Sequence, residues 1–319
     1  MDLQQAGSAG ARAAAQGGRE AALGRRAESR GLVLGLAGVV MFALTLPMTR
    51  LAVGEAAQPQ LPPAFVTAGR AALAGLLSVA WLAAVRAPWP GREQWPRLAV
   101  CALGTVVGFP LFLALALRHV DAMHAAVVTG VLPLATAVAA ALALRQRASA
   151  AFWACAVLGC CLVLAYAALQ GGGALLRADL LLLGAVASAA IGYVAGARLS
   201  ECLPGEQTIC WVLVLSLPLT LPAALLLWPA HGARAAAWGG FVYVSLFSMW
   251  LGFFAWYRGL ALGGVMRVSQ VQLLQPFIAL LAAVPILGER LDPITVGFAL
   301  SVMAVVFLGR RFPAGQSRP

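Results

Sequence analysis

Ten long apolar runs dominate the sequence and limit the folds that it can adopt. They cover residues 31–49, 64–86, 98–117, 122–144, 148–168, 179–197, 207–228, 238–258, 268–287 and 293–309. A helix needs about 20 apolar residues to cross the hydrocarbon core of a bilayer, and these runs are close to that length. They are about twice as long as the strands of a membrane barrel and lack the alternation of such strands. We therefore predict an all-α membrane protein with about ten transmembrane helices.

The composition leaves little room for a water-soluble domain. Of the 319 residues, 62% are hydrophobic and 10% are charged, against about 45–50% and about 25% in soluble globular domains. The run 31–49 follows basic residues, as the core of a signal peptide does, but it is long for one and nine similar runs follow. We expect this run to remain as the first span.

All 22 basic residues are arginines, and their placement predicts an orientation. If residues 1–30 lie in the cytoplasm, 16 arginines fall on the cytoplasmic side, 5 fall on the other side, and Arg70 lies inside a span. The positive-inside rule then places both termini in the cytoplasm of a bacterium, with the helices in its inner (plasma) membrane. Because the arginines are scattered singly, we predict no nucleic-acid partner.

The order of the runs divides the chain into two halves of five spans. The predicted parts are a disordered basic tail (1–30), a first repeat (31–169), a linker (170–178), a second repeat (179–309) and a second cytoplasmic tail (310–319). With an odd number of spans, the halves enter the membrane from opposite faces, as in the inverted repeats of secondary transporters. Residues 133–147 align without gaps with 276–290, and residues 42–50 resemble 190–198. We expect a substrate cavity between the halves.

The second half carries a family resemblance. The segment 243–309, which begins YVSLFSMWLGFFAWYRGLALGG and includes LGERL at 287–291, resembles the second repeat of the EamA family in the drug/metabolite transporter superfamily. The likeness extends over nearly all of residues 31–309, although Gln146 stands where the family usually carries Glu in the first copy. The resemblance implies a ten-helix secondary carrier, commonly an exporter of amino acids or other metabolites.

Other functions stay open at this stage. A carrier of nucleotide sugars or of quaternary ammonium and drug-like cations is the nearest alternative, and a polytopic membrane enzyme is the next. An enzyme needs a nucleophile with a base or clustered acids, and an ATP-driven pump needs a GxxxxGK[ST] loop; the sequence offers neither. We therefore predict no enzyme activity and no cofactor. The expected partners are a small-molecule substrate and the lipid bilayer, with a homodimer as an open alternative.

A metal site is a weaker interpretation of one short segment. His119, Asp121 and His124 lie close together between two runs, where they could bind a metal or simply be solvated. We predict solvated side chains and no metal. The other acids outside the N-terminal tail also fall at helix ends or in loops. Without a carboxylate at the bilayer centre, we expect weak or absent ion coupling.

Arg70 is the one basic residue well inside a run. It lies six positions into its predicted helix, at a depth of about 9 Å by helical rise. An ionisable group at such a depth predicts a functional site, here one that holds a substrate carboxylate. Alternatively, its long side chain reaches the outer interface.

The remaining cavity candidates are aromatic and amide side chains within the runs. Aromatic residues from Tyr243 to Tyr257 recur every three or four positions and share one face of the eighth predicted helix, and the ninth carries several uncharged polar groups. The predicted cavity residues, besides Arg70, are Tyr193, Trp250, Phe254, Ser269, Gln272 and Gln275. Each has packing between helices as its alternative role.

Two prolines and a stripe of small residues suggest how the helices bend and pack. Pro133 and Pro276 each remove a backbone donor, which predicts a kink that could serve gating or be merely structural. Small residues recur every fourth position from Gly184 to Gly196 along the sixth predicted helix. We interpret this stripe as a surface for close helix packing.

Overall fold

The computed structural model describes residues 28–143, 149–171, 177–264 and 268–311. By length and composition, eight of its helices can cross a membrane: Glu28–Val53, Pro63–Ala84, Arg92–Ala116, Ala122–Ala143, Ala150–Gln170, Arg177–Leu199, Gly205–Leu226 and Ala235–Gly263. Two shorter apolar helices, Val271–Leu287 and Pro293–Gly309, follow. No strand occurs in the described ranges, where only Gly54 and Pro59 form an isolated bridge. The prediction of an all-α fold with about ten spans is confirmed.

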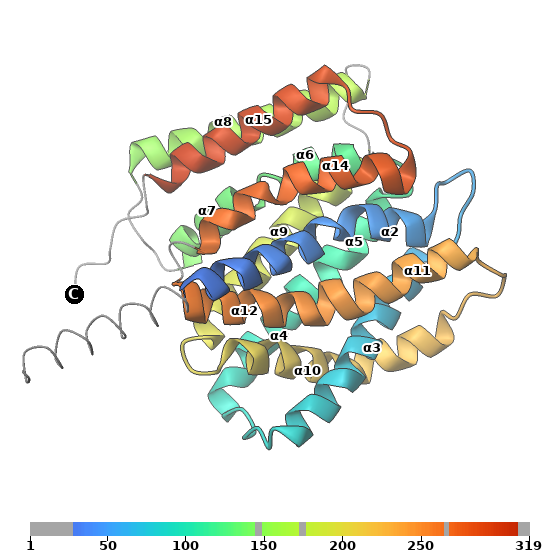
Figure 1. The fold of residues 1–319 in the computed structure, drawn as a ribbon, viewed down its shortest axis with the longest axis vertical. Coiled ribbons are helices and arrows are strands. Elements are labelled where there is room, and N and C mark those ends of the chain that lie inside the picture. The colour runs from blue at the N-terminus through green and yellow to red at the C-terminus, as the bar shows by residue number, and fades with distance from the viewer. Residues whose placement is uncertain (1–27, 144–148, 172–176, 265–267, 312–319) are drawn as a thin grey trace, which may run out of the picture.

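Several spans consist of more than one element (Figure 1). In chain order the elements are α2 (Thr45–Val53), α3 (Pro63–Ala84), η1 (Arg92–Gln94), α4 (Trp95–Cys101), η2 (Ala102–Gly108), α5 (Phe109–Ala116), α6 (Ala122–Thr129), α7 (Leu132–Ala143), α8 (Ala150–Gln170), α9 (Arg177–Leu199), α10 (Gly205–Leu226), α11 (Ala235–Tyr243), η3 (Val244–Leu251), α12 (Gly252–Gly263), η4 (Ser269–Leu274), α14 (Gln275–Leu287) and α15 (Pro293–Arg310). The segments η2 and η3 are π-helical, whereas η1 and η4 are 3₁₀-helical.

The two halves of the chain pack into one another. Helix α3 runs along α10, α8 along α15, and α6 against α14; α2 also packs against α11, and α5 against α9 (Figure 1). Counted along the chain, these contacts join spans 2 and 7, 5 and 10, 4 and 9, 1 and 8, and 3 and 6. If each span is replaced by the equivalent span of the other half, the same set of pairs results. Such pairing is what two inverted repeats produce, while the boundaries assigned to the repeats and tails remain a prediction.

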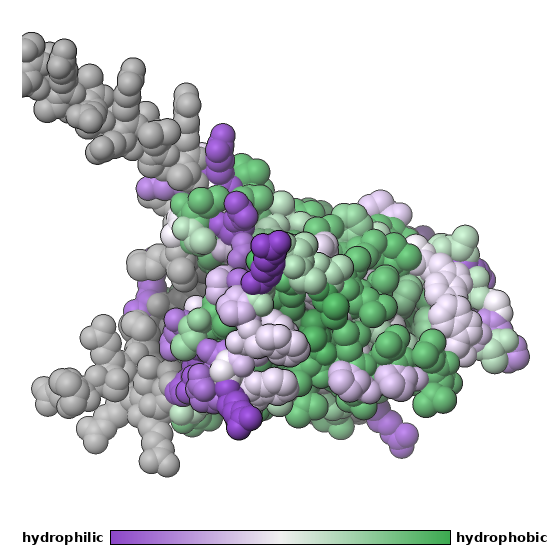
Figure 2. All heavy atoms as spheres, turned by 90° about the horizontal axis from the view of Figure 1, so that it is seen from below, coloured by the Kyte–Doolittle hydropathy of each residue, from purple (hydrophilic) through white to green (hydrophobic). Residues whose placement is uncertain are grey.

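The surface has the polarity that a bilayer requires. Figure 2 shows apolar side chains gathered over the middle of the molecule and polar side chains at both ends. Leu142, Leu225 and Leu281 are among the large apolar residues that are more than 60% exposed. Apolar surface of this extent is rare on soluble monomers. Lipid chains therefore cover this apolar middle part of the surface, in agreement with the predicted spans.

The fourth and ninth spans are interrupted next to their prolines. The fourth span breaks between α6 and α7, immediately before Pro133, and in the ninth η4 gives way to α14 immediately before Pro276. Proline has no N–H to donate and its ring collides with the preceding turn. Both interruptions lie where the prolines predict a kink, while a bend at these positions and a role in gating remain predictions.

The small residues of α9 let another helix approach closely. A Cβ atom on Gly192 would lie 2.7 Å from Cγ2 and 2.9 Å from the backbone nitrogen of Thr105. A Cβ atom on Gly104, opposite, would lie 2.5 Å from the carbonyl oxygen of Ser188. The packing interpretation of this stripe is confirmed, and it brings η2 against α9.

Candidate functional site

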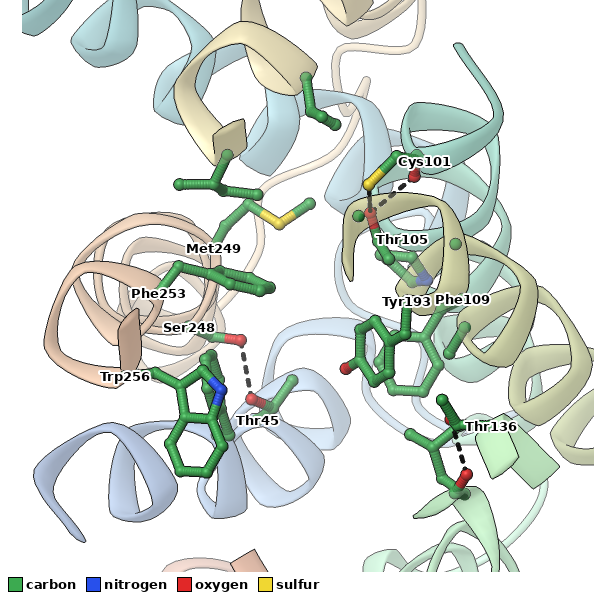
Figure 3. A pocket seen from close by; sticks show the side chains of 18 of the residues that line it. Thr45, Cys101, Thr105, Phe109, Thr136, Tyr193, Ser248, Met249, Phe253 and Trp256 are labelled. Carbon is green, nitrogen blue, oxygen red and sulfur yellow. Dashed lines mark hydrogen bonds between the residues drawn. The ribbon is translucent and has the colours of Figure 1, made fainter. Parts of the chain in front are cut away.

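A cavity of about 480 Å³ lies between the two halves. Figure 3 shows side chains from well-separated parts of the sequence pointing into it. We call it the central cavity. Its lining includes Phe42, Thr45, Arg70, Thr105, Phe109, Thr129, Leu132, Tyr193, Val212, Ser248, Phe253, Trp256, Tyr257, Gln272 and Gln275. Its size suits a small molecule, because ligand sites typically measure about 300–1,000 Å³.

Two π-helical segments face this cavity from corresponding spans. A shift of 143 residues, the one that aligns 133–147 with 276–290, places 102–108 of η2 on 245–251 of η3. Under this shift Thr105 falls on Ser248, and both line the cavity. π-Helical turns are rare and concentrate at functional sites. Because these segments occur at the same register in both repeats, they mark this part of the cavity as a candidate functional site.

Further lining residues also occupy equivalent positions. The pairs are Thr129 with Gln272 and Leu132 with Gln275, both at a shift of 143, and Thr45 with Tyr193, which follows from the match of 42–50 with 190–198. The central cavity therefore lies where the pseudo-two-fold axis of the repeats passes through the protein.

Arg70 is buried beside the cavity. Its side chain comes from α3, the residue is 3% exposed, and Nη2 donates to Oγ of Ser248 at 2.9 Å. The Ser248 hydroxyl is also 2.7 Å from that of Thr45, so the guanidinium joins a hydroxyl pair across the repeats. Nε of Arg70 is buried without a hydrogen-bond partner. The structure excludes the interfacial position for Arg70 and leaves the carboxylate-binding role as a prediction.

The other predicted cavity residues separate into two groups. Tyr193, Gln272 and Gln275 line the cavity, whereas Trp250 and Phe254 do not. The latter two pack together, with ring centroids 4.8 Å apart. For Ser269, the side chain lies outside what the structure describes. A functional role for any of these residues remains a prediction.

The π segment η3 changes which aromatic residues of this span face the cavity. A π turn takes up one more residue than an α turn, so the residues after it are rotated relative to an uninterrupted α-helix. Phe253, Trp256 and Tyr257 therefore face the cavity instead of Trp250 and Phe254. Phe254 lies against Trp81 of α3, with ring centroids 5.0 Å apart.

The central cavity reaches the surface at one end of the molecule. Ser200, an exposed residue directly after α9, belongs to its lining. The first described helix begins and α15 finishes at this same end, which we call the tail end (Figure 1). Toward the opposite end, the far end, Leu46 and Arg70 lie seven residues from the ends of their helices at Val53 and Pro63, or about 10 Å along the axis.

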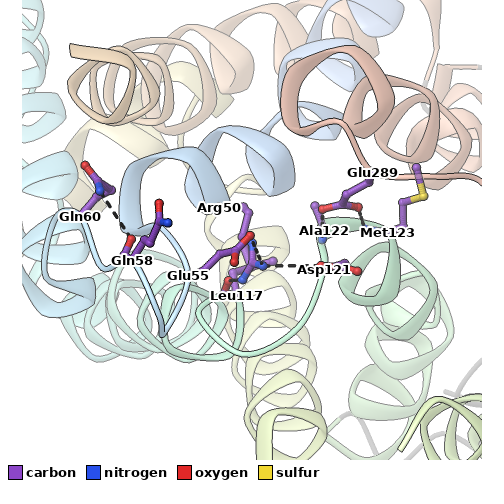
Figure 4. A network of polar contacts seen from close by, with 9 residues as sticks. All are labelled: Arg50, Glu55, Gln58, Gln60, Leu117, Asp121, Ala122, Met123 and Glu289. Atoms are coloured by element: carbon purple, nitrogen blue, oxygen red, sulfur yellow. Dashed lines mark hydrogen bonds and ion pairs between the residues drawn. The ribbon is translucent and has the colours of Figure 1, made fainter. Parts of the chain in front are cut away.

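Arg50 joins several groups at the far end (Figure 4). It donates through Nη1 to the carbonyl oxygen of Leu117, and its Nη2 lies 3.4 Å from Glu55 and 3.5 Å from Asp121. Both acids are more than 60% exposed, so the ion pairs themselves contribute little. The bond to a buried carbonyl is the stronger contact, because the charged donor is itself only 8% exposed.

Glu289 ties the second repeat to the first at this end. Its two carboxylate oxygens accept the N–H groups of Ala122 and Met123, at 2.7 and 2.8 Å (Figure 4). These are the first amides of α6, where unpaired donors and the helix dipole favour an anion. We call the contacts of Arg50 and Glu289 together the far-end closure.

Equivalent residues cap α8 and α15. Ser149 accepts the N–H of Phe152 at 3.2 Å, and Asp292, 143 residues later, accepts that of Thr295 at 2.9 Å. Burial raises the pKa of Asp292, but the hydroxyl and N–H of Thr295 donate to its carboxylate and hold that pKa below its ordinary value. The capping side chain is thus an ionised carboxylate in Asp292 and a neutral hydroxyl in its counterpart Ser149.

A buried contact between His124 and Asp179 corrects the prediction for His124. The solvated position is wrong for this residue, which belongs to α6, is 7% exposed, and places Nε2 2.6 Å from Oδ1 of Asp179. His119 and Asp121 are exposed, as predicted. All three border a second, smaller cavity of about 220 Å³ near the far end. Within the described ranges, no cluster of His, Cys, Asp and Glu is suited to hold a metal.

These features define the class of the protein, which is a multi-pass membrane protein of two inverted helical repeats around a central cavity. The sequence profile of the EamA-like transporter family matches residues 29–166 and 176–310, and the chain belongs to this family of the drug/metabolite transporter superfamily. It is therefore a transporter.

Two individual proteins show the same relationship. "Uncharacterized transporter YdeK" of Bacillus subtilis (strain 168) is 43% identical over 288 residues, which cover 89% of this chain and 98% of that protein. A solved crystal structure superposes with a TM-score of 0.58 and 19% identity, covering 87% of this chain and 98% of the other. That similarity supports the fold.

Proposed function

We propose that the protein is a secondary transporter that exports amino acids or related compounds across the bacterial inner membrane by alternating access. The single observation that carries this proposal is the central cavity, which lies between the repeats, reaches the surface at the tail end and is closed at the far end. The excess of arginines in the tail-end segments favours a cytoplasmic position for that end. A substrate for export then enters from the cytoplasm.

The lining of the cavity bears on the alternatives. Among the described lining residues the charged one is Arg70, and the other polar groups are hydroxyls, amides, a thiol and an indole N–H. A carrier of quaternary ammonium or drug-like cations is disfavoured, because a cation would share a buried site with a guanidinium. A nucleotide sugar carries more than one negative charge, which a single arginine does not balance. Membrane enzymes remain the second class of function.

Two further parts of the proposal concern energy and assembly. Because none of the described residues that line the cavity is an acid, we expect the substrate gradient to drive transport, with little or no coupling to an ion. As partners we expect the substrate and the surrounding lipid and no nucleic acid, and a homodimer also remains a prediction.

Counterflow into proteoliposomes tests the proposal. Purified full-length protein is offered a panel of amino acids and their derivatives, nucleotide sugars and quaternary amines. We expect exchange of one class without an imposed ion gradient, and reduced exchange in Gln272→Ala. Leu281→Ala, a lipid-facing change that leaves the cavity intact, is the matched control and should behave as wild type. If no compound moves while a lipid is chemically altered, the protein is an enzyme instead.

A further inference from the structure

Arg70 is a buried cation without a counter-ion. No ion pair to its guanidinium occurs among the described residues, and Nε has no hydrogen-bond partner. Burying an unpaired charge is energetically costly, so proteins pair such groups or use them. The protein chain supplies Arg70 with hydroxyl and sulfur contacts from Ser248 and Met249, and neither carries a charge. The missing anion must come from elsewhere.

The central cavity is where such an anion can reach Arg70. Arg70, Ser248 and Thr45 all line it, and the two hydroxyls lie 2.7 Å apart beside the guanidinium. A carboxylate placed here accepts from the planar guanidinium and from a hydroxyl at the same time. Charge-assisted bonds of this kind are roughly twice as strong as neutral ones.

The rest of the lining offers no second charge. None of the described residues that line the cavity is acidic, so a substrate ammonium would lose its water without gaining a carboxylate. A monoanion bound to Arg70 makes the loaded site neutral, whereas a zwitterion leaves it positive. The ring faces of Phe253, Trp256 and Tyr257 instead suit an apolar or aromatic group.

The charge is confined to one wall of the cavity. Helices α3 and α10 are equivalent spans that begin after Pro62 and Pro204, so the counterpart of Arg70 is Val212, which also lines the cavity. Two walls that are otherwise related by the repeat therefore differ in charge. That difference gives a bound molecule a fixed orientation.

We propose that the transported substrate is an amphipathic monocarboxylate, bound with its carboxylate at Arg70, Ser248 and Thr45 and its apolar group toward Phe253 and Trp256. This inference rests on the proposed export function. It narrows amino acids and related compounds to those without a free ammonium, such as N-acylated or deaminated derivatives. It also assigns Arg70 and Ser248 the selection of substrate charge.

Three probes that share a phenyl ring test the proposal. N-acetylphenylalanine is a monoanion, phenylalanine a zwitterion and phenethylamine a cation. In wild-type proteoliposomes we expect the monoanion to be transported about tenfold faster or more than the other two, because a site built for one polar group rejects ligands that leave it unpaired. Its movement should also be electrogenic on a supported membrane, with the sign of a negative charge.

Variants then assign the selectivity to Arg70. We expect Arg70→Gln to lose transport of N-acetylphenylalanine, Arg70→Lys to retain part of it with a higher KM, and Ser248→Ala to raise the KM by several-fold. Leu281→Ala should match wild type. Equal transport of phenylalanine or phenethylamine by wild type overturns the inference, and so does an unchanged KM in Arg70→Gln.

The design separates failure of the inference from failure of the proposed function. If wild type carries a zwitterion or a cation well, the protein is a transporter and the proposed charge selection is wrong. If wild type exchanges none of these probes and none of the earlier panel, the transport proposal itself fails. Charge selectivity is measured on wild type, so a folding defect in Arg70→Gln does not weaken that arm.

Discussion

The far end and the tail end of the molecule are built from equivalent positions, yet their chemistry differs. Because the repeats are inverted, a far-end residue of one repeat has its counterpart at the tail end in the other. The far-end residues and their counterparts are Arg50 with Arg198, Asp121 with Gly264, Glu289 with Gln146, and Asp292 with Ser149. In these four pairs, each far-end acid is matched by an uncharged residue, whereas the arginine is matched by another arginine.

This difference indicates which end of the cavity the sequence keeps closed. The far end is closed by a carboxylate on a helix N-terminus and by an arginine on a buried carbonyl. At the tail end, Gln146 lies outside the described residues, and as an amide it lacks the charge of Glu289. The sequence therefore offers no charged counterpart of this contact for closing that end, and we expect the tail-open form to be favoured when no substrate is bound.

The largest effect is expected for Glu289→Ala. The substitution removes both charge-assisted bonds to α6, which we expect to destabilise the far-end closure by about 3 kcal/mol, a shift of about a hundredfold in the conformational equilibrium. Spin labels at Ala57 and Ile294, in a background without the six native cysteines, should report a longer far-end distance. A variant at the neighbouring exposed Arg290, Arg290→Gln, is the control, and an unchanged distance in Glu289→Ala would remove the basis of the comparison.

A smaller effect is expected from the retained arginines. Arg50→Gln loses the bond to Leu117 and two exposed ion pairs, about 2 kcal/mol in total. Arg198→Gln should cost less than about 0.5 kcal/mol, because Arg198 has no ion pair among the described residues. Denaturant unfolding in detergent measures both. Equal losses would mean that the two ends are alike.

The two π segments allow the comparison to be extended to the cavity walls. Gly104→Ala places a Cβ atom 2.5 Å from the Ser188 carbonyl and 2.7 Å from Cα of Gly192, so we expect a loss of about 1.5 kcal/mol. Its counterpart Phe247 is 40% exposed, and Phe247→Ala should cost about 0.5 kcal/mol from the lost stacking on Tyr243. Thermal unfolding distinguishes the two. A larger loss in Phe247→Ala would contradict this difference between the walls.

The smallest effect concerns the helix caps and depends on pH. The pKa of Asp292 is lower in the folded protein than its ordinary value of about 3.9, so the cap stabilises above that value and is lost as pH falls through the folded pKa. As pH falls from about 5 through the folded pKa of Asp292, wild type should lose about 1 kcal/mol that Asp292→Asn does not lose. Ser149→Ala should destabilise by a similar amount at every pH. Thermal unfolding across this pH range is the measurement.

Much of the architecture could be predicted from hydropathy alone. The length and hydrophobicity of the apolar runs determine that they form helical spans, since a bilayer admits few other backbone structures. Arg70 and Gln272 were found as cavity residues because polar groups in hydrocarbon must face protein or water. The repeat match also contained a signal for Thr45. The alignment of 42–50 with 190–198 pairs Thr45 with Tyr193, which was already a predicted cavity residue.

Other parts of the site depended on local geometry that a sequence of apolar residues does not reveal. The residues of η3 fit an α-helix as well as a π-helix, so the rotation that brings Trp256 to the cavity was not foreseeable from spacing. The His124–Asp179 pair joins residues 55 positions apart. Packing between α6 and α9 determines that contact, and neither residue alone indicates it.

The matching π segments carry a consequence for the ancestry of the protein. A π turn is equivalent to one extra residue in an α-helix, and it occurs at the same register in η2 and η3. One insertion before gene duplication accounts for both more simply than two separate events. We infer that the ancestral five-helix chain already had this bulge and formed its cavity by pairing with an inverted copy of itself. Since Val212 occupies the position equivalent to Arg70, we infer that the charge arose or persisted in one copy only, after the duplication.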